Sequence, residues 1–281
     1  MRKYKEKIMQ VVFLLTACVS IAAVALICIY LLGSGIPTIL KIGPANFFGK
    51  LWKPSKNLFG ILPMIVGSIY VTAGAILIGV PIGLLCAIYL SRFCPKPIYR
   101  VLKPAVELMA GIPSIVYGFF GLMVIVPVIQ KLSGTSGKSL LTASILLGIM
   151  ILPTIISVAE SSLNAVPNSY YEGSLALGAT HERSVFSAVL PAAKSGVMSG
   201  VVLGVGRAIG ETMAVIMIAG NQAIMPSGLL KGLRTMTANI VLEMGYASGL
   251  HREALIATGV VLFVFILIIN TCFSLLKRRN G

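Results

Sequence analysis

The sequence predicts an all-α integral membrane protein with six transmembrane helices and both termini in the cytoplasm. Of its 281 residues, 57% are hydrophobic and only 11% are charged, which lies far outside the composition of soluble domains. Six segments are apolar over about 20 residues or more, the length with which an α-helix crosses a hydrocarbon core about 30 Å thick. They lie near residues 8–32, 62–91, 106–129, 140–159, 195–219 and 254–276.

The positions of the basic residues predict the orientation. An even number of spans places both termini on one side, and both tails are basic, with "RKYKEK" at the start and "LLKRRNG" at the end. With the tails inside, 13 Lys and Arg residues lie on the inner side and 9 on the outer side. Cytoplasmic segments carry such an excess. The first apolar run is about twice as long as the core of a signal peptide, so we expect it to be a retained span.

The net charge of +15 does not indicate a nucleic-acid partner, because most of the excess lies beside spans, where basic residues set topology. The five cysteines lie in spans or at their ends and form no C-x-x-C pair. His181 and His251 fall on opposite sides of the membrane, so we assign them no role. We therefore expect no metal and no other cofactor. The loops are too short for separate domains, which predicts a single transmembrane domain over residues 1–281.

The chain is expected to bind no nucleotide of its own. The loop "SGTSGKS" at 133–139 ends like a phosphate-binding loop, but Leu132 occupies the position of the first glycine of that motif, and a span precedes it instead of a strand. The string "GVGRAIG" likewise has neither the spacing nor the βαβ context of a dinucleotide site. The sequence thus predicts a protein that is not an enzyme.

Glycines and prolines inside the spans predict a closely packed bundle of bent helices. Gly196, Gly200 and Gly204 recur every four residues, as do Gly206 and Gly210, so neighbouring helices are expected to approach closely there. Prolines kink membrane helices where protein or a wet cavity satisfies the freed carbonyl groups. The prolines expected to form kinks are Pro81, Pro113, Pro127 and Pro153.

Arg207 and Glu211 are the charged residues inside the predicted fifth span. On one continuous helix, residues four apart lie on the same face, so we expect the two side chains to meet. An arginine near the bilayer centre costs about 2.5–3.5 kcal/mol on insertion scales, which excludes a lipid-facing position. Two interpretations remain open. The pair is a salt bridge that fixes helix register, or it lines the substrate pathway, with Glu211 orienting a guanidinium that binds a passing anion.

The longest inner segment, residues 160–194, is expected to be the docking element for another protein. Pro167 followed by Ser169-x-x-Glu172 has the pattern of a capping box and predicts a short helix. Pro191 marks the start of the next span. Such a helix is too small to be a domain and too ordered to be a plain linker.

The outer loop 220–253 has two interpretations. It contacts an extracytoplasmic partner or gates the pathway, or it forms a helix on the membrane surface. In the surface helix, the apolar face would carry Leu229, Leu230 and Leu233, and the solvated charges would be Lys231, Arg234 and Glu243.

Glu172, Gly178, Leu190 and Pro191 have the spacing of the "EAA" loop, E-A-A-x-x-x-G followed after nine residues by I-x-L-P. The segment therefore resembles permease subunits of bacterial ATP-binding-cassette importers. The departures are Gly173 and Ser174 in place of the two alanines and Ala188 in place of the isoleucine.

Further strings make the resemblance more specific. Together they are similar to the permeases of phosphate-specific importers, and to the C-type subunit more than to the A-type. The resemblance covers at least residues 60–276. The strings are "AGIPSIVYGFFGL" (110–122), "LPTI" (152–155), "YEGSLALGAT" (171–180), "GRAIGETMAV" (206–215) and "RTMTANIVLEM" (234–244).

The resemblance implies a six-helix bundle of the type I importer class in the bacterial cytoplasmic membrane, in contact with lipid. It implies as partners a second, homologous permease subunit, a dimer of cytoplasmic ATPases and an extracytoplasmic phosphate-binding protein. It also implies that Arg207 and Glu211 act in transport and that residues 172–191 take up the force of ATP hydrolysis. Three alternatives stay open: a permease for molybdate or sulfate, a scaffold or sensor that binds the ATPase without moving solute, and, with less support, a proton-driven transporter.

Overall fold

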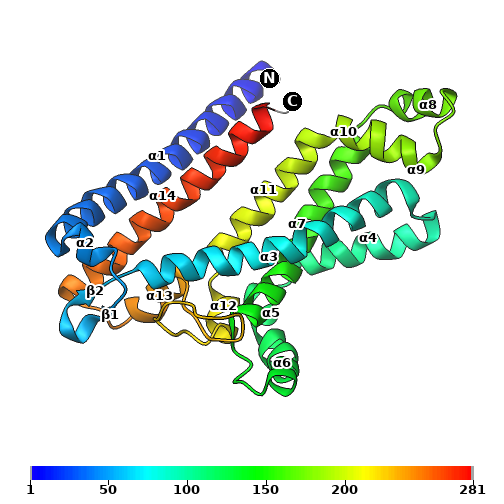
Figure 1. Ribbon diagram of the computed structural model, residues 1–281. Coiled ribbons are helices and arrows are strands. Elements are labelled where there is room, and N and C mark those ends of the chain that lie inside the picture. The colour runs from blue at the N-terminus through cyan, green and yellow to red at the C-terminus, as the bar shows by residue number, and fades with distance from the viewer. Residues whose placement is uncertain (1, 280–281) are drawn as a thin grey trace.

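The computed structural model describes residues 2–279, with side chains described for residues 6–272 and 275. The chain is a bundle of long helices with short helices at both ends and one small hairpin (Figure 1). The helices are α1 (Arg2–Ile42), α2 (Pro44–Phe47), α3 (Leu62–Ile88), α4 (Lys96–Gly111), α5 (Ser114–Phe120), α6 (Val126–Ser133), α7 (Leu140–Asn164), α8 (Asn168–Ala176), α9 (His181–Ser184), α10 (Leu190–Ala192), α11 (Lys194–Gly210), α12 (Met213–Ile218), α13 (Met236–Met244) and α14 (Gly249–Arg279), and the strands are β1 (Trp52–Lys53) and β2 (Leu58–Phe59).

The described helices agree with six predicted spans. Five are long and apolar enough to cross a membrane. Residues 181–192 and 194–210, which are bent by 73° relative to each other, make a sixth if the bent pair counts as one span, and α11 and α12 lie within the predicted fifth span at 195–219. Figure 1 shows both termini and α8 at the same end of the molecule and the hairpin at the other. Most of the basic side chains of the two tails lie outside the described residues.

The third span begins later than the sequence predicts. Residues 96–111 form α4, a separate helix without buried residues, and the span itself begins at Ser114. Ile112 is extended, with a ψ of 126°. The cause is Pro113, because a proline disfavours helical backbone at the residue before it. The expected start at residue 106 was therefore wrong.

Two prolines coincide with widened helical turns. Residues 121–125 and 185–189 form π-helical turns, and Pro127 and Pro191 follow each of them by two residues. A proline donates no hydrogen bond, and its ring clashes with the carbonyl group four residues earlier. That carbonyl lies inside the widened turn in both places, which relieves the clash.

The centre of the bundle is α7, which packs against α3 on one side and α11 on the other. A Cβ atom at Gly204 would lie 2.8 Å from the side chain of Ile155, and one at Gly196 or Gly200 would press on Ser162 or Val158. The predicted close packing of these three glycines is thus confirmed. The same prediction for Gly206 and Gly210 is wrong within this chain, because a Cβ atom at either position would meet nothing within 4 Å.

This difference yields a matched pair of substitutions. Gly204→Ala is expected to destabilise the bundle by about 1–3 kcal/mol, the usual cost of overpacking a core. Gly206→Ala adds the same methyl group to open space and should leave stability unchanged or raise it slightly, since alanine favours helix. Thermal unfolding of this chain purified alone in detergent compares them, because Gly206 faces open space only within the single chain. Equal midpoints would contradict the contact between α11 and α7.

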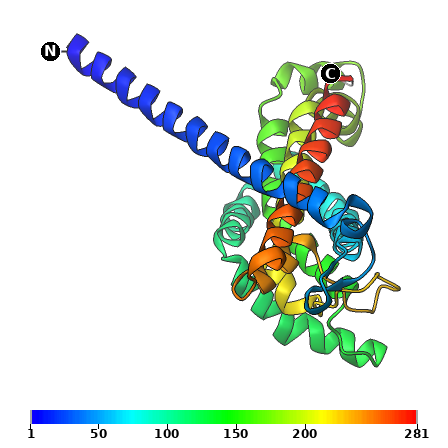
Figure 2. The ribbon, with the colours of Figure 1, turned by 90° about the vertical axis from the view of Figure 1, so that its left-hand side faces the viewer.

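Helix α1 belongs to the bundle through its C-terminal part only. Gly35 lies against Val260 and Leu31 lies near Gly259, both on α14. The N-terminal half then leaves the other helices and projects alone (Figure 2). None of the most apolar window of α1 is buried. The first span thus exposes a long apolar surface to whatever surrounds this chain.

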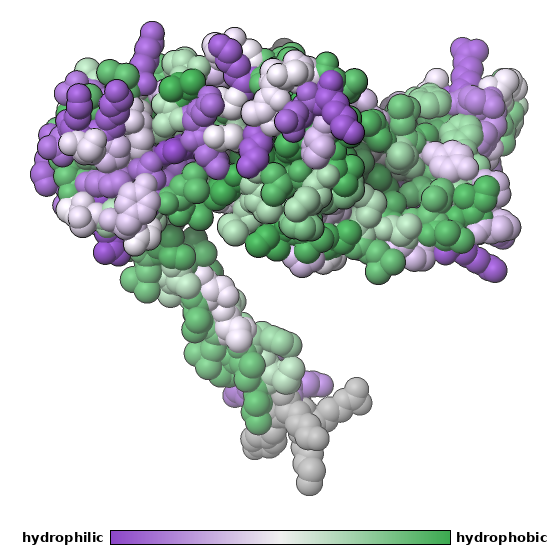
Figure 3. Space-filling view, turned by 90° about the horizontal axis from the view of Figure 1, so that it is seen from below, coloured by the Kyte–Doolittle hydropathy of each residue, from purple (hydrophilic) through white to green (hydrophobic). Residues whose placement is uncertain are grey.

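The hairpin end carries the polar loops. Strands β1 and β2 pair antiparallel, with Trp52 opposite Phe59. Figure 3 shows hydrophilic side chains gathered over the left-hand part of the lower face, the side on which the hairpin lies in Figure 1. The surface helix expected around Leu229, Leu230 and Leu233 was wrong. Leu233 is fully buried and its N–H donates to Ala219 O, while the helix begins only at Met236.

Candidate functional site

The fifth span is interrupted where its charged residues lie. Helix α11 ends at Gly210, Glu211 is extended with a ψ of 130°, and α12 begins at Met213. Glu211 Oε1 accepts hydrogen bonds from the N–H groups of Thr212 (3.1 Å) and Ala214 (3.3 Å). The carboxylate therefore satisfies N–H groups that the start of α12 leaves free. The continuous helix expected through residue 211 was wrong.

The expected ion pair between Arg207 and Glu211 is also absent from the described part of the chain. Because the backbone leaves the helix at Glu211, the two side chains no longer follow one helical face. Arg207 is half-buried, and its Nη1 donates to the hydroxyl of Thr154 on α7 at 3.3 Å. That neutral hydroxyl is the one acceptor that the described residues offer to this guanidinium, so its positive charge has no counter-ion among them.

One face of α11 is open beside Arg207. Leu203 is 55% exposed, and the space around Gly206 and Gly210 is empty. Helix α11 buries its opposite face against α7 and α14. An open face with little side-chain bulk and an unpaired arginine suits either a partner helix or a water-filled passage.

Helix α13, which lies at the hairpin end of the molecule, stabilises the break in the fifth span at Glu211. The hydroxyl of Thr237 donates to Glu211 O at 3.2 Å, and the N–H of Met236 donates to Ser68 Oγ on α3 at 3.0 Å. Thr235 caps the helix by accepting from the N–H of Ala238. The first turn of α13 thus fixes the backbone at Glu211.

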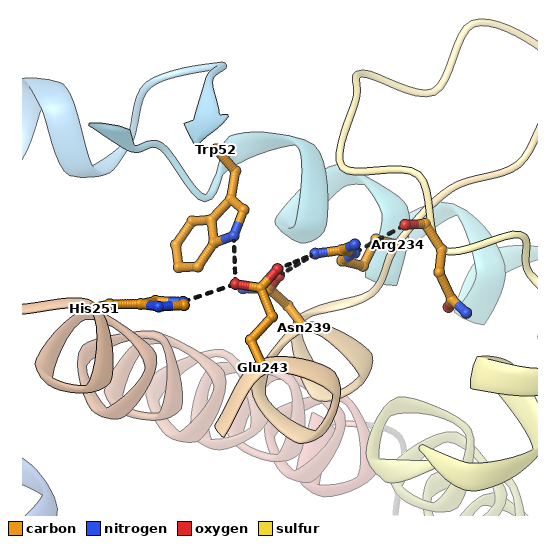
Figure 4. Close-up of polar contacts among 6 residues, drawn as sticks. Trp52, Arg234, Asn239, Glu243 and His251 are labelled. Carbon is orange, nitrogen blue, oxygen red and sulfur yellow. Dashed lines mark hydrogen bonds and ion pairs between the residues drawn. The ribbon is translucent and has the colours of Figure 1, made fainter. Parts of the chain in front are cut away.

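The other end of α13 carries a polar cluster that the sequence analysis missed (Figure 4). Five residues form this Glu243 cluster: Trp52, Arg234, Asn239, Glu243 and His251. Glu243 Oε2 accepts from Trp52 Nε1 at 2.9 Å and from His251 Nε2 at 2.8 Å, and Oε1 pairs with Arg234 Nη1 at 2.5 Å.

Glu243 is only 6% exposed, so its carboxylate joins the hairpin, α13 and α14 inside the protein. The interpretation of Arg234 and Glu243 as solvated charges was therefore wrong, and His251 has a structural role. The partners are separated by up to 191 residues, a pairing that no local pattern indicates.

The segment predicted to dock another protein forms a projecting helix, α8, at the end that carries the termini (Figure 1). Glu172 is exposed on it. Gly178 follows it with a φ of +85°, a left-handed conformation that favours glycine at a helix end. Leu190 and Pro191 form the turn of α10 before α11. The four motif residues thus lie on α8, just after it, and at the turn that leads into α11.

The capping box expected in this segment does not form. Helix α8 begins directly after Pro167, with no side-chain cap. The anchor is instead a hydrogen bond of 2.7 Å between Tyr171 Oη and His181 Nδ1. The His181 ring also packs edge-on against Phe93, with ring centroids 4.6 Å apart. Because Phe93 ends the span that begins with α3, His181 ties α8 to the cytoplasmic end of that second span.

A second buried carboxylate lies at this end. Glu160 is 2% exposed and accepts from Tyr99 Oη and Lys103 Nζ, each at 2.7 Å, which fastens α4 to α7. Burial lowers the pKa of Lys103, but the hydrogen bond and charge of Glu160 outweigh it and leave the pKa above its usual value. The hydrogen bond to Glu160 likewise raises the pKa of Tyr99. An acidic residue directly after the predicted fourth span was the available indication of this contact.

The comparison with protein families matches residues 79–280 to the binding-protein-dependent transport system inner membrane component. A probable ABC transporter permease protein, YqgH of Bacillus subtilis, is 41% identical over 92% of this chain and 88% of its own length. The phosphate transport system permease protein PstC of Mesorhizobium japonicum is 36% identical over 78% of this chain and 73% of its own. The PstC protein of Xylella fastidiosa is 35% identical over 95% and 91%.

Solved structures have the same fold. The bacterial alginate ABC transporter superposes with a TM-score of 0.67 at 16% identity, over 95% of this chain and 94% of that one. An inward-facing methionine ABC transporter, MetNI, gives a TM-score of 0.62 at 20% identity, over 82% and 100%. The predicted fold class is confirmed, and the chain belongs to the family of inner membrane components of binding-protein-dependent transport systems, as a permease subunit and not an enzyme.

Proposed function

We propose that this chain is one permease subunit of an ATP-driven importer of inorganic phosphate and forms half of the translocation pathway. The permeases named PstC that resemble it over most of its length support the choice of cargo. The observation that carries the mechanism is the unpaired arginine at the break in the fifth span.

An uncompensated guanidinium is costly in a membrane span unless water and an anion reach it. Arg207 presents its planar fork of donors beside the open face of α11, and only Thr154 accepts from it within the described chain. A phosphate oxyanion meets this need, because two of its oxygens match two parallel N–H groups.

Glu211 favours a protonated oxyanion over a fully ionised one. Its Oε1 is taken by backbone N–H groups, whereas none of the described residues donates to Oε2. Phosphate carries at least one proton at neutral pH, and its P–OH group can donate a hydrogen bond to such an acceptor. Sulfate and molybdate carry none and would meet only repulsion there.

The proposal predicts a selectivity order. Arsenate, protonated like phosphate, should compete with phosphate uptake, while a tenfold excess of sulfate or molybdate should leave uptake nearly unchanged. Uptake of labelled phosphate by vesicles that contain the full importer measures this. In Glu211→Gln the repulsion is gone, so the preference over sulfate should shrink. Suppression of wild-type transport by sulfate but not by arsenate would reject phosphate as the cargo.

We further propose that the open face of α11 meets a second, homologous permease, that α8 docks on a dimer of cytoplasmic ATPases, and that an extracytoplasmic phosphate-binding protein delivers the anion. The exposed Glu172 and the Gly178 turn support α8 as the docking helix. In this scheme ATP-driven closure moves α8, and the broken and bent helices rock so that the site at Arg207 opens to the other side.

A further inference from the structure

The hairpin at the outer end is strongly basic. Lys50, Lys53 and Lys56 are exposed on and beside it, and none forms an ion pair with a described residue. The sequence contains no acidic residue between Glu6 and Glu107. The hairpin therefore presents positive charge that no described residue neutralises.

A groove of about 590 Å³ lies between this hairpin and the loop that follows α1. Its apolar lining includes Leu51, which is 59% exposed, and Leu58, which is 39% exposed. Lys41 and Lys50 stand at its polar edge, and Lys41 is paired with Glu253. We refer to this feature as the hairpin groove: an exposed apolar floor with a basic margin.

The hairpin groove rests on a rigid support. Trp52 is 7% exposed and Phe59 is 1% exposed, and both pack into a core with Phe47, Ile61 and residues of α13 and α14. The Trp52 indole also donates to the buried Glu243. The lysines are thus carried on a fixed frame and not on a mobile loop.

We propose that the hairpin groove, together with Lys53 and Lys56, is the docking surface for an acidic surface loop with an apolar tip on the extracytoplasmic solute-binding protein. This inference rests on the proposed function. Complementary charge steers two proteins together, and an apolar contact surrounded by charges holds them. A rigid frame favours a folded protein partner, whose shape has to match, over lipid headgroups, which adapt to any basic surface.

The test uses the complete importer in nanodiscs and the solute-binding protein that stimulates ATP hydrolysis by the wild-type complex. The variant reverses all three hairpin charges, Lys50→Glu with Lys53→Glu and Lys56→Glu. The matched control reverses three charges on the other outer loops, Lys131→Glu with Lys138→Glu and Lys231→Glu. The Kd for docking is expected to rise about tenfold or more in the hairpin variant at physiological salt, and much less in the control. The difference should shrink at about 1 M salt.

Two results would overturn the inference. Unchanged docking by the hairpin variant, or equal weakening in the control, would show that the hairpin is not the contact. Unchanged docking with weaker binding of the variant to phosphatidylglycerol vesicles would assign the lysines to the membrane. Unchanged docking with slower phosphate uptake would indicate that the hairpin lysines attract phosphate instead of the binding protein. Failure of the wild-type importer to move phosphate counts against the proposed cargo alone, because docking is measured separately.

Discussion

Replacing Arg207 with glutamine is expected to reduce phosphate uptake by about a hundredfold or more while the importer still assembles. The guanidinium has no counter-ion among the described residues, so no internal pair is broken by its removal. What is lost is the charge that meets the anion in a poorly solvated passage, an effect of about 2–5 kcal/mol for close charge pairs. Uptake of labelled phosphate, with the amount of assembled complex measured in the same membranes, tests this.

Two further substitutions separate charge from geometry. Arg207→Lys keeps the charge but loses the planar fork, so uptake should fall to an intermediate level. Thr154→Val removes the hydroxyl that Arg207 donates to and should have a small effect, because the anion supplies stronger acceptors. Normal uptake by the Arg207→Gln variant would end the assignment of this residue to the pathway.

Replacing Glu243 with alanine is expected to destabilise the importer by about 3–5 kcal/mol, the cost of leaving a buried partner charge without its counter-ion. Arg234 is 17% exposed in its side chain and would lose its carboxylate, and the indole of Trp52 would lose its acceptor. Uptake should fall as well, because α13 holds the backbone at Glu211. The midpoint of thermal unfolding and the uptake rate together measure the effect.

The same end of the molecule offers a matched control. Glu253 pairs with Lys41 at 3.1 Å, but its side chain is 43% exposed. Exposed pairs contribute about 0–1 kcal/mol, so Glu253→Ala should leave the midpoint nearly unchanged. If both variants unfolded at the same temperature, the cluster around Glu243 would not be the anchor of the hairpin end.

The membrane spans were predictable because they require only a continuous apolar stretch of sequence. A run of about 20 apolar residues is both necessary and nearly sufficient for a membrane helix, and α3, α7 and α14 follow it closely. The end of α4 could also have been predicted from Pro113, because a proline disfavours helical backbone at the residue directly before it. The boundary at residue 106 ignored that rule and followed hydropathy alone.

The site was less predictable, because its decisive contacts are tertiary. The stretch around Gly210 contains no proline, and the break there is stabilised by Thr237, 26 residues further along the chain. Helical spacing therefore predicted a pair between Arg207 and Glu211 that the folded chain does not make. The hydrogen bonds to Glu243 likewise come from three separate segments. In contrast, Glu172, Gly178, Leu190 and Pro191 lie within one continuous segment, so their spacing can be recognised from the sequence alone.

The projecting half of α1 has a consequence for biogenesis. Its most apolar window is wholly uncovered by the rest of the chain. In a newly inserted copy this apolar helix would be exposed to the bilayer. It could then associate with helices of other membrane proteins. Production of this chain without its companion subunits is thus expected to give poor yields and early proteolysis, and simultaneous synthesis of all subunits from one transcript would shorten the exposure.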